Sequence, residues 1–301
     1  MSVMHVYLHA CLTLRAKSVL APLAAVFWLV LPGLMQAAPN ELKFGVFPQL
    51  STRVMVETYQ PLVDFLGETI GQTLRLESAK DFHTFHLRTM GGEYDLVLTA
   101  PHLAWLAWKE GGYRPLLVYG EPAKGFIVVR TDSPYRKPGD LRGKTIAIPD
   151  SYAVVNIRLT KMLASSGLNP GREIAVTEVG SHTNAAAHVY ERQSEAAIVG
   201  VFPFLRLPGE MRKGLRIIAQ TPDLPSHVFL VHTRLAGKRE KSLELAIGQF
   251  MRSEEGAAFL QKNGFGGVRA LKKDELKQVE GDARELLRRF QAQPGAAGEK
   301  K

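Results

Sequence analysis

The sequence predicts an exported α/β protein of two lobes, each a mostly parallel sheet flanked by helices, with two hinge crossovers between them. Three observations predict it: an apolar leader, a β-α-β-α-β order that occurs twice, and a weak similarity between the two copies. In that similarity, residues 92–97 before Pro101 (Gly-Glu-Tyr-Asp-Leu-Val) parallel residues 194–199 before Pro203 (Ser-Glu-Ala-Ala-Ile-Val). Such sheets bind ligands beyond the carboxyl ends of their strands.

Residues 1–38 have the features of a secretory signal peptide. Arg15 and Lys17 precede an apolar run from Val19 to Leu34, and Ala37 and Ala38 follow it. Prolines interrupt the run, which is shorter than the roughly 20 residues that a membrane span needs. We therefore expect cleavage near Ala37 or Ala38. An uncleaved anchor is the alternative, because larger residues precede Ala37 where a small one is usual.

The cysteine and charge content narrows the class of protein. Cys11, the only cysteine, lies in the leader, so the mature chain has no disulfide and no thiol chemistry. A cysteine-free exported chain long enough for two domains is typical of the bacterial periplasm. The net charge is +9, and loss of Arg15 and Lys17 with the leader leaves +7, which favours anionic partners. Lysines and arginines are scattered without an aromatic-interleaved strip, so we expect no nucleic-acid binding.

The first β-α-β-α-β copy begins at residue 42. Apolar and polar residues alternate over 42–46, which predicts a strand. A helix follows with apolar residues at helical spacing up to Ile70; Gly71 ends it, and Pro61 restricts where its regular part begins. The rest of this copy is a strand at 73–76, a helix at 82–90 and a buried strand at 94–98 that exits into the loop 99–102.

The second copy follows a crossover near Glu121-Pro122, and the chain later crosses back at 221–225. Its predicted elements are strands at 126–129, 144–148, 174–179, 196–201 and 217–218, with helices at 155–163 and 181–192. After a strand at 228–231, amphipathic helices at 243–251, 254–262 and 273–290 should pack against the first lobe. Lobe 1 then comprises 40–122 and 224–290, lobe 2 comprises 123–223, and 291–301 is a disordered polar tail.

The segment from Pro138 to Thr145 nearly matches a nucleotide-binding phosphate loop. Pro138 occupies the place of the first glycine, however, and Lys144 and Thr145 open a strand instead of a helix. We expect no nucleotide cofactor, and no cofactor of another kind is indicated.

Residues 140–148 (Asp-Leu-Arg-Gly-Lys-Thr-Ile-Ala-Ile) resemble the start of the second lobe in a known family. It is the family of phosphate/phosphite/phosphonate ABC-transporter periplasmic substrate-binding proteins, which have the type II periplasmic binding protein fold. Other stretches agree with that family in order and approximate spacing, namely residues 44–48, 94–101, 180–182 and 221–225. The resemblance covers roughly residues 42–265. The Asp-Leu-Arg-Gly-Lys part is shared by many binding proteins of this architecture, so it indicates the fold better than the ligand.

The resemblance implies a ligand site at the strand exits. In the family, a Ser/Thr-rich turn and helix N-terminal amides hold an oxyanion; here the matching turn is 150–154, and only Ser151 keeps a short hydroxyl. We assign Asp150 to the helix N-cap, and capping is also the alternative role for Ser151. His182 matches a family pocket position. The candidate ligand-binding residues are Gln49, Thr99, His102, Ser151, Tyr152, Ala153 and His182, with ordinary loop polarity the alternative for Thr99 and His102.

Several further patterns bear on the ligand and on catalysis. The loop 200–204 has no carboxylate for an ammonium group, and Phe202 and Phe204 favour an apolar or planar ligand portion unless they are core residues. His83 and His86 lie three apart on a predicted helix, but no short spacing diagnostic of a metal site is present, so we expect no metal. No catalytic motif is recognisable, so we do not expect an enzyme.

The resemblance therefore implies a periplasmic solute-binding protein of an ABC importer. It would capture a small oxyanion, of the phosphonate, phosphite or phosphate ester class, between its lobes and pass it to a membrane permease with a cytoplasmic ATPase. We expect a monomer. The alternative is a sensory or orphan binding module for a ligand without phosphorus, presented to a membrane receptor, which the low hydroxyl content of 151–153 favours.

Overall fold

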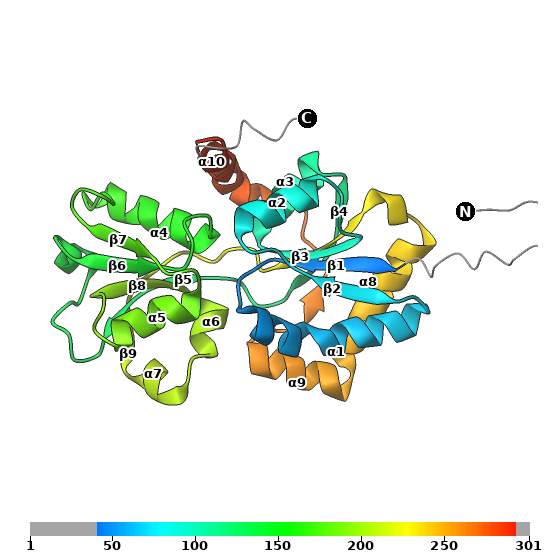
Figure 1. Ribbon diagram of the computed structural model, residues 1–301, viewed down its shortest axis with the longest axis horizontal. Helices are drawn as coiled ribbons and strands as arrows, with labels where there is room; N and C mark the ends of the chain where they lie inside the picture. Colours follow the sequence, from blue (N-terminus) through cyan, green and yellow to red (C-terminus); the bar gives the residue numbers. More distant parts are fainter. Residues whose placement is uncertain (1–40, 293–301) are drawn as a thin grey trace, which may run out of the picture. The chain divides into compact units, whose positions relative to one another are not determined.

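The computed structural model describes residues 41–292. The predicted leader and residues 293–301 of the predicted tail lie outside the described residues. Within 41–292, no helix is long and apolar enough to cross a bilayer. The described chain forms two sheets, each flanked by helices (Figure 1), and we name the elements around the six-stranded sheet lobe 1 and those around the five-stranded sheet lobe 2.

Lobe 1 has the strand order β11-β4-β10-β3-β1-β2. Its strands are β1 (Leu42–Val46), β2 (Leu74–Glu77), β3 (Leu96–Thr99), β4 (Tyr113–Tyr119), β10 (Val228–His232) and β11 (Val268–Arg269). Its helices are α1 (Thr52–Ile70), α2 (Phe82–Met90), α3 (Pro101–Glu110), α8 (Lys238–Arg252), α9 (Glu254–Asn263) and α10 (Glu280–Gln291), with 3₁₀ turns η2 (Thr233–Leu235) and η3 (Glu275–Val279).

Lobe 2 has the strand order β7-β6-β8-β5-β9. Its strands are β5 (Gly125–Arg130), β6 (Thr145–Ile148), β7 (Ala175–Glu178), β8 (Ala196–Gly200) and β9 (Leu215–Gln220). Its helices are α4 (Val154–Ser165), α5 (His182–Tyr190), α6 (Val201–Leu205) and α7 (Gly209–Lys213), with a 3₁₀ turn η1 (Pro138–Leu141).

The two-lobed α/β fold is confirmed, and both sheets are mixed where we had expected mostly parallel ones. The β-α-β units pair in parallel as predicted, β1 with β2 and β3, and β6 with β7 and β8. The strands next to the crossovers pair antiparallel: β10 with β3 and β4, and β5 with β8 and β9. β5 and β10 pair antiparallel because the chain enters each of them directly from the other lobe. A parallel neighbour would need a helical connection on the face of the same sheet.

The two crossovers between the lobes are hydrogen-bonded to each other. Ala123 and Leu224 exchange both backbone bonds, at N···O distances of 3.0 and 2.9 Å. The crossover at Gly120 also lies tight against the chain after α9, because a Cβ on Gly120 would lie 2.4 Å from the carbonyl oxygen of Gly266. A larger residue at Gly120 would therefore separate two backbone segments.

Among the differences from the prediction, three concern the helices α1, α3 and α10. α1 runs straight through Pro61 and ends at Gly71, whose φ of 65° allows the left-handed cap. The predicted loop 99–102 contains only the end of β3 at Thr99 and the N-cap Ala100, because α3 begins at Pro101. Proline fits the first helical position, where its missing N–H is no loss. The predicted last helix is divided into η3 and α10.

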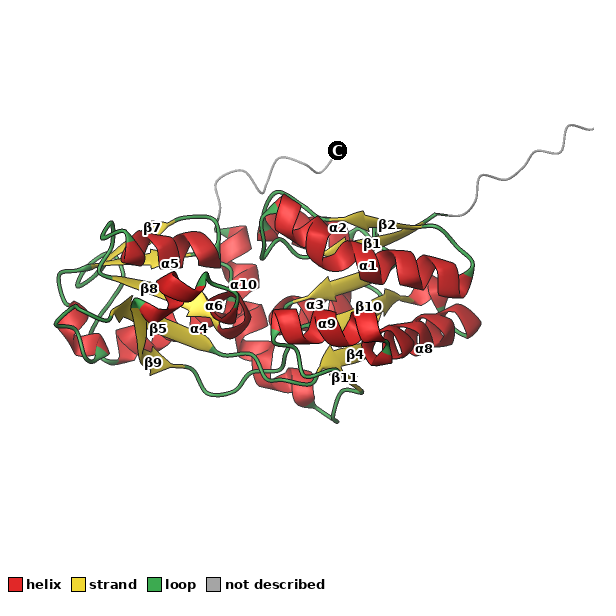
Figure 2. Cartoon of the chain, turned by 90° about the horizontal axis from the view of Figure 1, so that it is seen from below, coloured by secondary structure: helices red, strands yellow, loops and turns green. Residues whose placement is uncertain are grey.

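The C-terminal helices pack against lobe 1 as predicted, and α10 also contacts lobe 2. α8 packs along α1, and α9 packs against α8 (Figure 2). α10 packs on α3 and also contacts α4 of lobe 2. The core of lobe 1 is aromatic, with fully buried Phe44, Tyr59, Tyr94, Phe229 and Phe250.

Two helical glycines give a matched stability prediction. In α9, a Cβ on Gly256 would lie 1.7 Å from the carbonyl oxygen of Phe250 and 2.9 Å from the Cα of Met251, and backbone atoms cannot rotate away. We expect Gly256→Ala to lower the free energy of unfolding by about 3 kcal/mol. Gly281 in α10 has nothing within 4 Å of such a Cβ, so Gly281→Ala should raise it by up to about 1 kcal/mol. Urea unfolding tests both, and a shift of the same sign in both variants would contradict the packing argument.

Candidate functional site

A small cavity of about 40 Å³ brings together the strand exits of both lobes. Lobe 1 contributes residues from the ends of β1 and β3, lobe 2 contributes the starts of α4, α5 and α6, and the crossovers contribute three residues. The lining comprises Phe47, Gln49, Phe82, Ala100, Pro101, Ala123, Lys124, Ala153, Val154, Val155, His182, Gly200, Val201, Phe202, Pro203 and His227. No carboxylate is among these lining residues, so an anion placed there meets no like charge from the wall.

Three helices begin at this cavity without a side-chain cap. The N-caps of α3, α4 and α6 are Ala100, Ala153 and Gly200, and none makes a side-chain cap hydrogen bond. By contrast, Asp81 and Ser181 cap α2 and α5 through their side chains. An uncapped helix start offers backbone N–H groups and the positive end of the helix dipole. Groups of this kind are typical of anion-binding sites.

His182 holds a neutral imidazole at the wall of the cavity. It is the first residue of α5, and its Nδ1 accepts a hydrogen bond from the backbone N–H of Gly200 at 3.2 Å. A ring whose Nδ1 accepts carries its proton on Nε2. Burial lowers the pKa of His182 to about 4, although the carbonyl of Ile198 offsets part of this effect. The ring is therefore uncharged at physiological pH.

His227 lies in an aromatic surround at the second crossover. Its ring centroid is 4.8 Å from that of Phe47 and 5.3 Å from that of Phe202. Burial lowers the pKa of His227 to about 3, so this ring is also neutral at physiological pH. Its Nδ1 has no hydrogen-bond partner among the described residues.

Lys124 is the one cation among the lining residues, and it is already paired. Its Nζ lies 3.0 Å from Oδ1 of Asp223 on the returning crossover. The polar lining is otherwise neutral: the Gln49 amide, whose Nε2 lies 3.5 Å from the Tyr59 hydroxyl, and the two imidazoles. Apart from the paired Lys124, the polar groups that line this cavity are therefore uncharged.

Of the seven candidate residues, the structure brings three to the cavity. Gln49, Ala153 and His182 line it. Thr99 and His102 are fully buried behind the wall, and His102 sits in the first turn of α3. Ser151 and Tyr152 are turned toward lobe 1, where the carbonyl oxygen of Tyr152 lies 2.9 Å from Nε2 of His102.

The assignment of Asp150 to the N-cap of α4 is wrong. The helix begins at Val154, with Ala153 as its N-cap. Asp150 instead accepts a hydrogen bond from the backbone N–H of Tyr152 at 2.6 Å, which closes a local turn. This turn competes with capping because a short carboxylate reaches the amide two residues on most easily.

Sequence reasoning missed four lining residues that matter, namely Phe82, Lys124, Val155 and His227. Val155 was missed because the N-cap was assigned to Asp150, three residues before the true N-cap, Ala153. Phe82 was missed because its segment was interpreted only as a helix. A histidine directly after the turn-rich crossover 221–225 was the available signal for His227, since a crossover must pass the cleft. The aromatic Phe202, singled out for an apolar ligand portion, does line the cavity.

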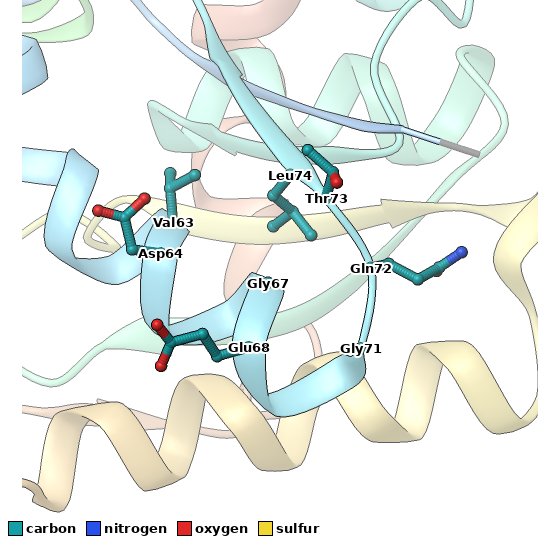
Figure 3. A pocket seen from close by; sticks show the side chains of 8 residues that line it. All are labelled: Val63, Asp64, Gly67, Glu68, Gly71, Gln72, Thr73 and Leu74. Atoms are coloured by element: carbon teal, nitrogen blue, oxygen red, sulfur yellow. The ribbon is translucent and has the colours of Figure 1, made fainter. Parts of the chain in front are cut away.

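Two other features are less suited to an anion. A larger surface groove of about 700 Å³ lies between the end of α1 and the start of β2 (Figure 3). Its rim carries the carboxylates of Asp64 and Glu68, which repel anions. Within the described part of the chain, no three His, Cys, Asp or Glu side chains are grouped so that they could hold a metal ion. His83 and His86 instead contact the ring of Phe290, at centroid distances of 4.6 and 5.0 Å.

Known structures share this fold at low sequence identity. A binding-protein component of an ABC phosphonate transporter from Pseudomonas aeruginosa matches with a TM-score of 0.74 and 16% identity, over 86% of this chain and 91% of that one. PhnD1 from Prochlorococcus marinus, solved in complex with methylphosphonate, matches with a TM-score of 0.74 and 13% identity, over 83% and 99%. XAC2383 from Xanthomonas citri, solved bound to chloride ion, matches with a TM-score of 0.68 and 20% identity, over 83% of this chain and 99% of that one.

The sequence itself matches a family profile over most of its length. The profile is described as ABC transporter, phosphonate, periplasmic substrate-binding protein, and it covers residues 44–276. That range includes the strand exits of both lobes and both crossovers. The chain therefore belongs to the family of periplasmic substrate-binding proteins of phosphonate ABC transporters.

Proposed function

We propose that this protein captures a small phosphonate-class oxyanion with an apolar substituent in the cavity between its lobes. It delivers the ligand, as a monomer, to a membrane permease driven by a cytoplasmic ATPase. The lobes comprise residues 40–122 with 224–290, and 123–223, and they close about the paired crossovers at Ala123 and Leu224. A mature chain released from its leader into the periplasm fits this role.

The observation that carries the proposal is the convergence of three uncapped helix starts on one small cavity. The uncapped first turns of α3 and α4 offer backbone N–H groups and the positive ends of their helix dipoles to an anion. The short helix α6 adds a third start, where the N–H of Val201 already donates to the carbonyl of Lys124. Tetrahedral oxyanions have several acceptor oxygens that such groups can satisfy together. The uncharged ring of His182 lines the cavity from a second direction.

The rest of the lining favours a short apolar substituent on the ligand. Phe47, Phe82 and Phe202 face the cavity together with Val155, and hydrocarbon placed there leaves water. The volume of about 40 Å³ leaves space for a ligand of only a few heavy atoms. An ammonium group would lose its hydration without a carboxylate partner in the lining, which is costly. Methylphosphonate, with which the Prochlorococcus marinus protein was solved in complex, combines an oxyanion with a short apolar substituent.

Isothermal titration calorimetry of the mature protein tests the proposal directly. The series is methylphosphonate, phosphite, phosphate, methanesulfonate, acetate and 2-aminoethylphosphonate. We expect methylphosphonate to bind, and 2-aminoethylphosphonate to bind at least about tenfold more weakly, because one unpaired buried polar group costs about 1–3 kcal/mol. The ligand class is wrong if acetate or methanesulfonate binds and no phosphorus oxyanion does.

A further inference from the structure

The C-terminal helix joins the two lobes beside the cavity. α10 belongs to the sequence of lobe 1, yet Nη1 of Arg289 donates a hydrogen bond to the carbonyl oxygen of Ser151 in lobe 2 at 2.6 Å. The next residue, Phe290, places its ring against Tyr152 of lobe 2, with a centroid distance of 4.7 Å, and against His86 of α2, at 5.0 Å. Two consecutive residues of α10 therefore hold the turn that precedes α4.

A second set of contacts joins α4 to η3 and to the first turn of α10, about two helical turns before Arg289. On α4, Nε of Arg158 donates to Oδ2 of Asp282 at 2.8 Å, and its Nη2 donates to the carbonyl oxygen of Gln278 at 2.7 Å. The side chain of Asp282 is only 8% exposed, so this ion pair is shielded from solvent on the α10 side. Charge-assisted bonds of this kind are the stronger ones in proteins. α4 is thus tied to lobe 1 along its length as well as at its start.

The consecutive carbonyl groups of Ser151 and Tyr152 both point to donors from lobe 1. The first accepts from Arg289, and the second lies 2.9 Å from Nε2 of His102 on α3. The next residues in the chain, Ala153, Val154 and Val155, are those that line the cavity. Fixing the two carbonyls therefore fixes the direction in which the first amides of α4 point.

We propose that Arg289 and Phe290 are positioning residues, which latch the Ser151–Tyr152 turn to lobe 1 and so aim the start of α4 at the ligand. The resemblance places ligand-binding hydroxyls of the family at this turn. In this chain, Ser151 and Tyr152 of the turn contact Arg289 and Phe290 instead. The contribution to affinity rests on the function proposed above, whereas the latch between the lobes does not depend on the identity of the ligand.

The latch has a consequence for the ligand-free protein. A ligand enters only when the lobes separate, and these contacts are lost on separation. They therefore favour the closed arrangement before any ligand is bound. A ligand that binds the closed arrangement gains apparent affinity in proportion to the fraction that is already closed.

Arg288 and Arg289 provide a matched pair of variants. Arg288 pairs with Glu285 on its own helix and is 66% exposed, while Arg289 also pairs with Glu285 but reaches across to Ser151. Arg288→Ala removes the same charge from the same helix without touching the latch. Arg289→Lys keeps a donor of nearly the same length and should restore part of the effect.

Small-angle X-ray scattering of the ligand-free protein and calorimetry with methylphosphonate give two separate readouts. We expect Arg289→Ala to enlarge the ligand-free radius of gyration and to raise Kd about tenfold, the effect of losing one charge-assisted hydrogen bond. Arg288→Ala should change neither, and Phe290→Ala should act like Arg289→Ala.

An Arg289→Ala protein with the same ligand-free radius of gyration as Arg288→Ala would overturn the latch. An enlarged radius with an unchanged Kd would overturn the positioning role. If the unmodified protein binds acetate or methanesulfonate and no phosphorus oxyanion, the proposed ligand class fails, and the scattering comparison still decides whether the latch exists.

Discussion

Replacing Ala153 with aspartate is expected to weaken methylphosphonate binding more than about a hundredfold while the protein stays folded. Ala153 is the N-cap of α4, lines the cavity and makes no side-chain cap hydrogen bond. An aspartate there accepts the N–H groups that the ligand oxygens need, as it does at ordinary helix starts. Its charge also repels the oxyanion at short range, where water no longer screens it.

Ala153→Asn separates the two causes. Asparagine has almost the same shape and caps the same amides without a charge, so we expect a smaller loss of about tenfold. Calorimetry with methylphosphonate measures both variants, and thermal unfolding without ligand shows that each is folded. Equal affinities for the aspartate and asparagine variants would show that charge at the start of α4 does not govern binding.

The free energy of unfolding should fall by several kcal/mol between about pH 7.5 and about pH 5. Burial lowers the pKa of His86, His102 and His182 to about 4 and that of His227 to about 3. In the unfolded chain each imidazole has a pKa of about 6.5. Below that value the unfolded chain takes up protons that the folded protein does not. Each histidine then lowers the free energy of unfolding by about 2 kcal/mol at about pH 5.

Asp150 acts in the opposite direction and does not cancel the effect. Burial raises its pKa to about 6, so the folded protein takes up this proton before the unfolded chain does. As the pH falls over the same interval, the folded state therefore gains about 1.4 kcal/mol at this one site. The sum over the four histidines is larger, so the net effect is acid destabilisation.

Urea unfolding at the two pH values measures this dependence. His227→Phe should reduce the loss by about 2 kcal/mol, because it removes one buried imidazole from a surround that already contains Phe47 and Phe202. A free energy of unfolding that stays constant from about pH 7.5 to about pH 5 would contradict the prediction, as would an identical loss in His227→Phe.

The order of strands and helices could be predicted from the sequence because each element is marked locally. β1 alternates apolar and polar residues, and β3 is a short, mostly apolar run. Gly71 ends α1 with a left-handed backbone. The predicted helix boundaries were wrong where a residue such as proline is compatible with two local structures. Pro61 is compatible with a helix interior when the surrounding packing supports it, and Pro101 begins a helix as readily as it closes a strand.

The site was less predictable because its residues come from distant segments. Gln49, Ala153 and His182 follow strands that the sequence identifies, so their approach to one cavity could be expected. The orientation of Ser151 depends on Arg289, which no local pattern near residue 151 indicates. His227 reaches the cavity only because the second crossover lies beside the first. Long-range contacts of this kind depend on tertiary packing, which spacing along the chain does not encode.

The position of β10 at the centre of the lobe 1 sheet determines the order in which the lobes can fold. β10 lies between β3 and β4, yet it is synthesised only after all of lobe 2. Lobe 2 is a continuous segment from β5 to β9 and can complete its sheet by itself. Lobe 1 must wait for a strand from the far side of that segment, and closing so long a loop is slow. A newly made chain therefore keeps half of its structure open until almost all of it has been synthesised.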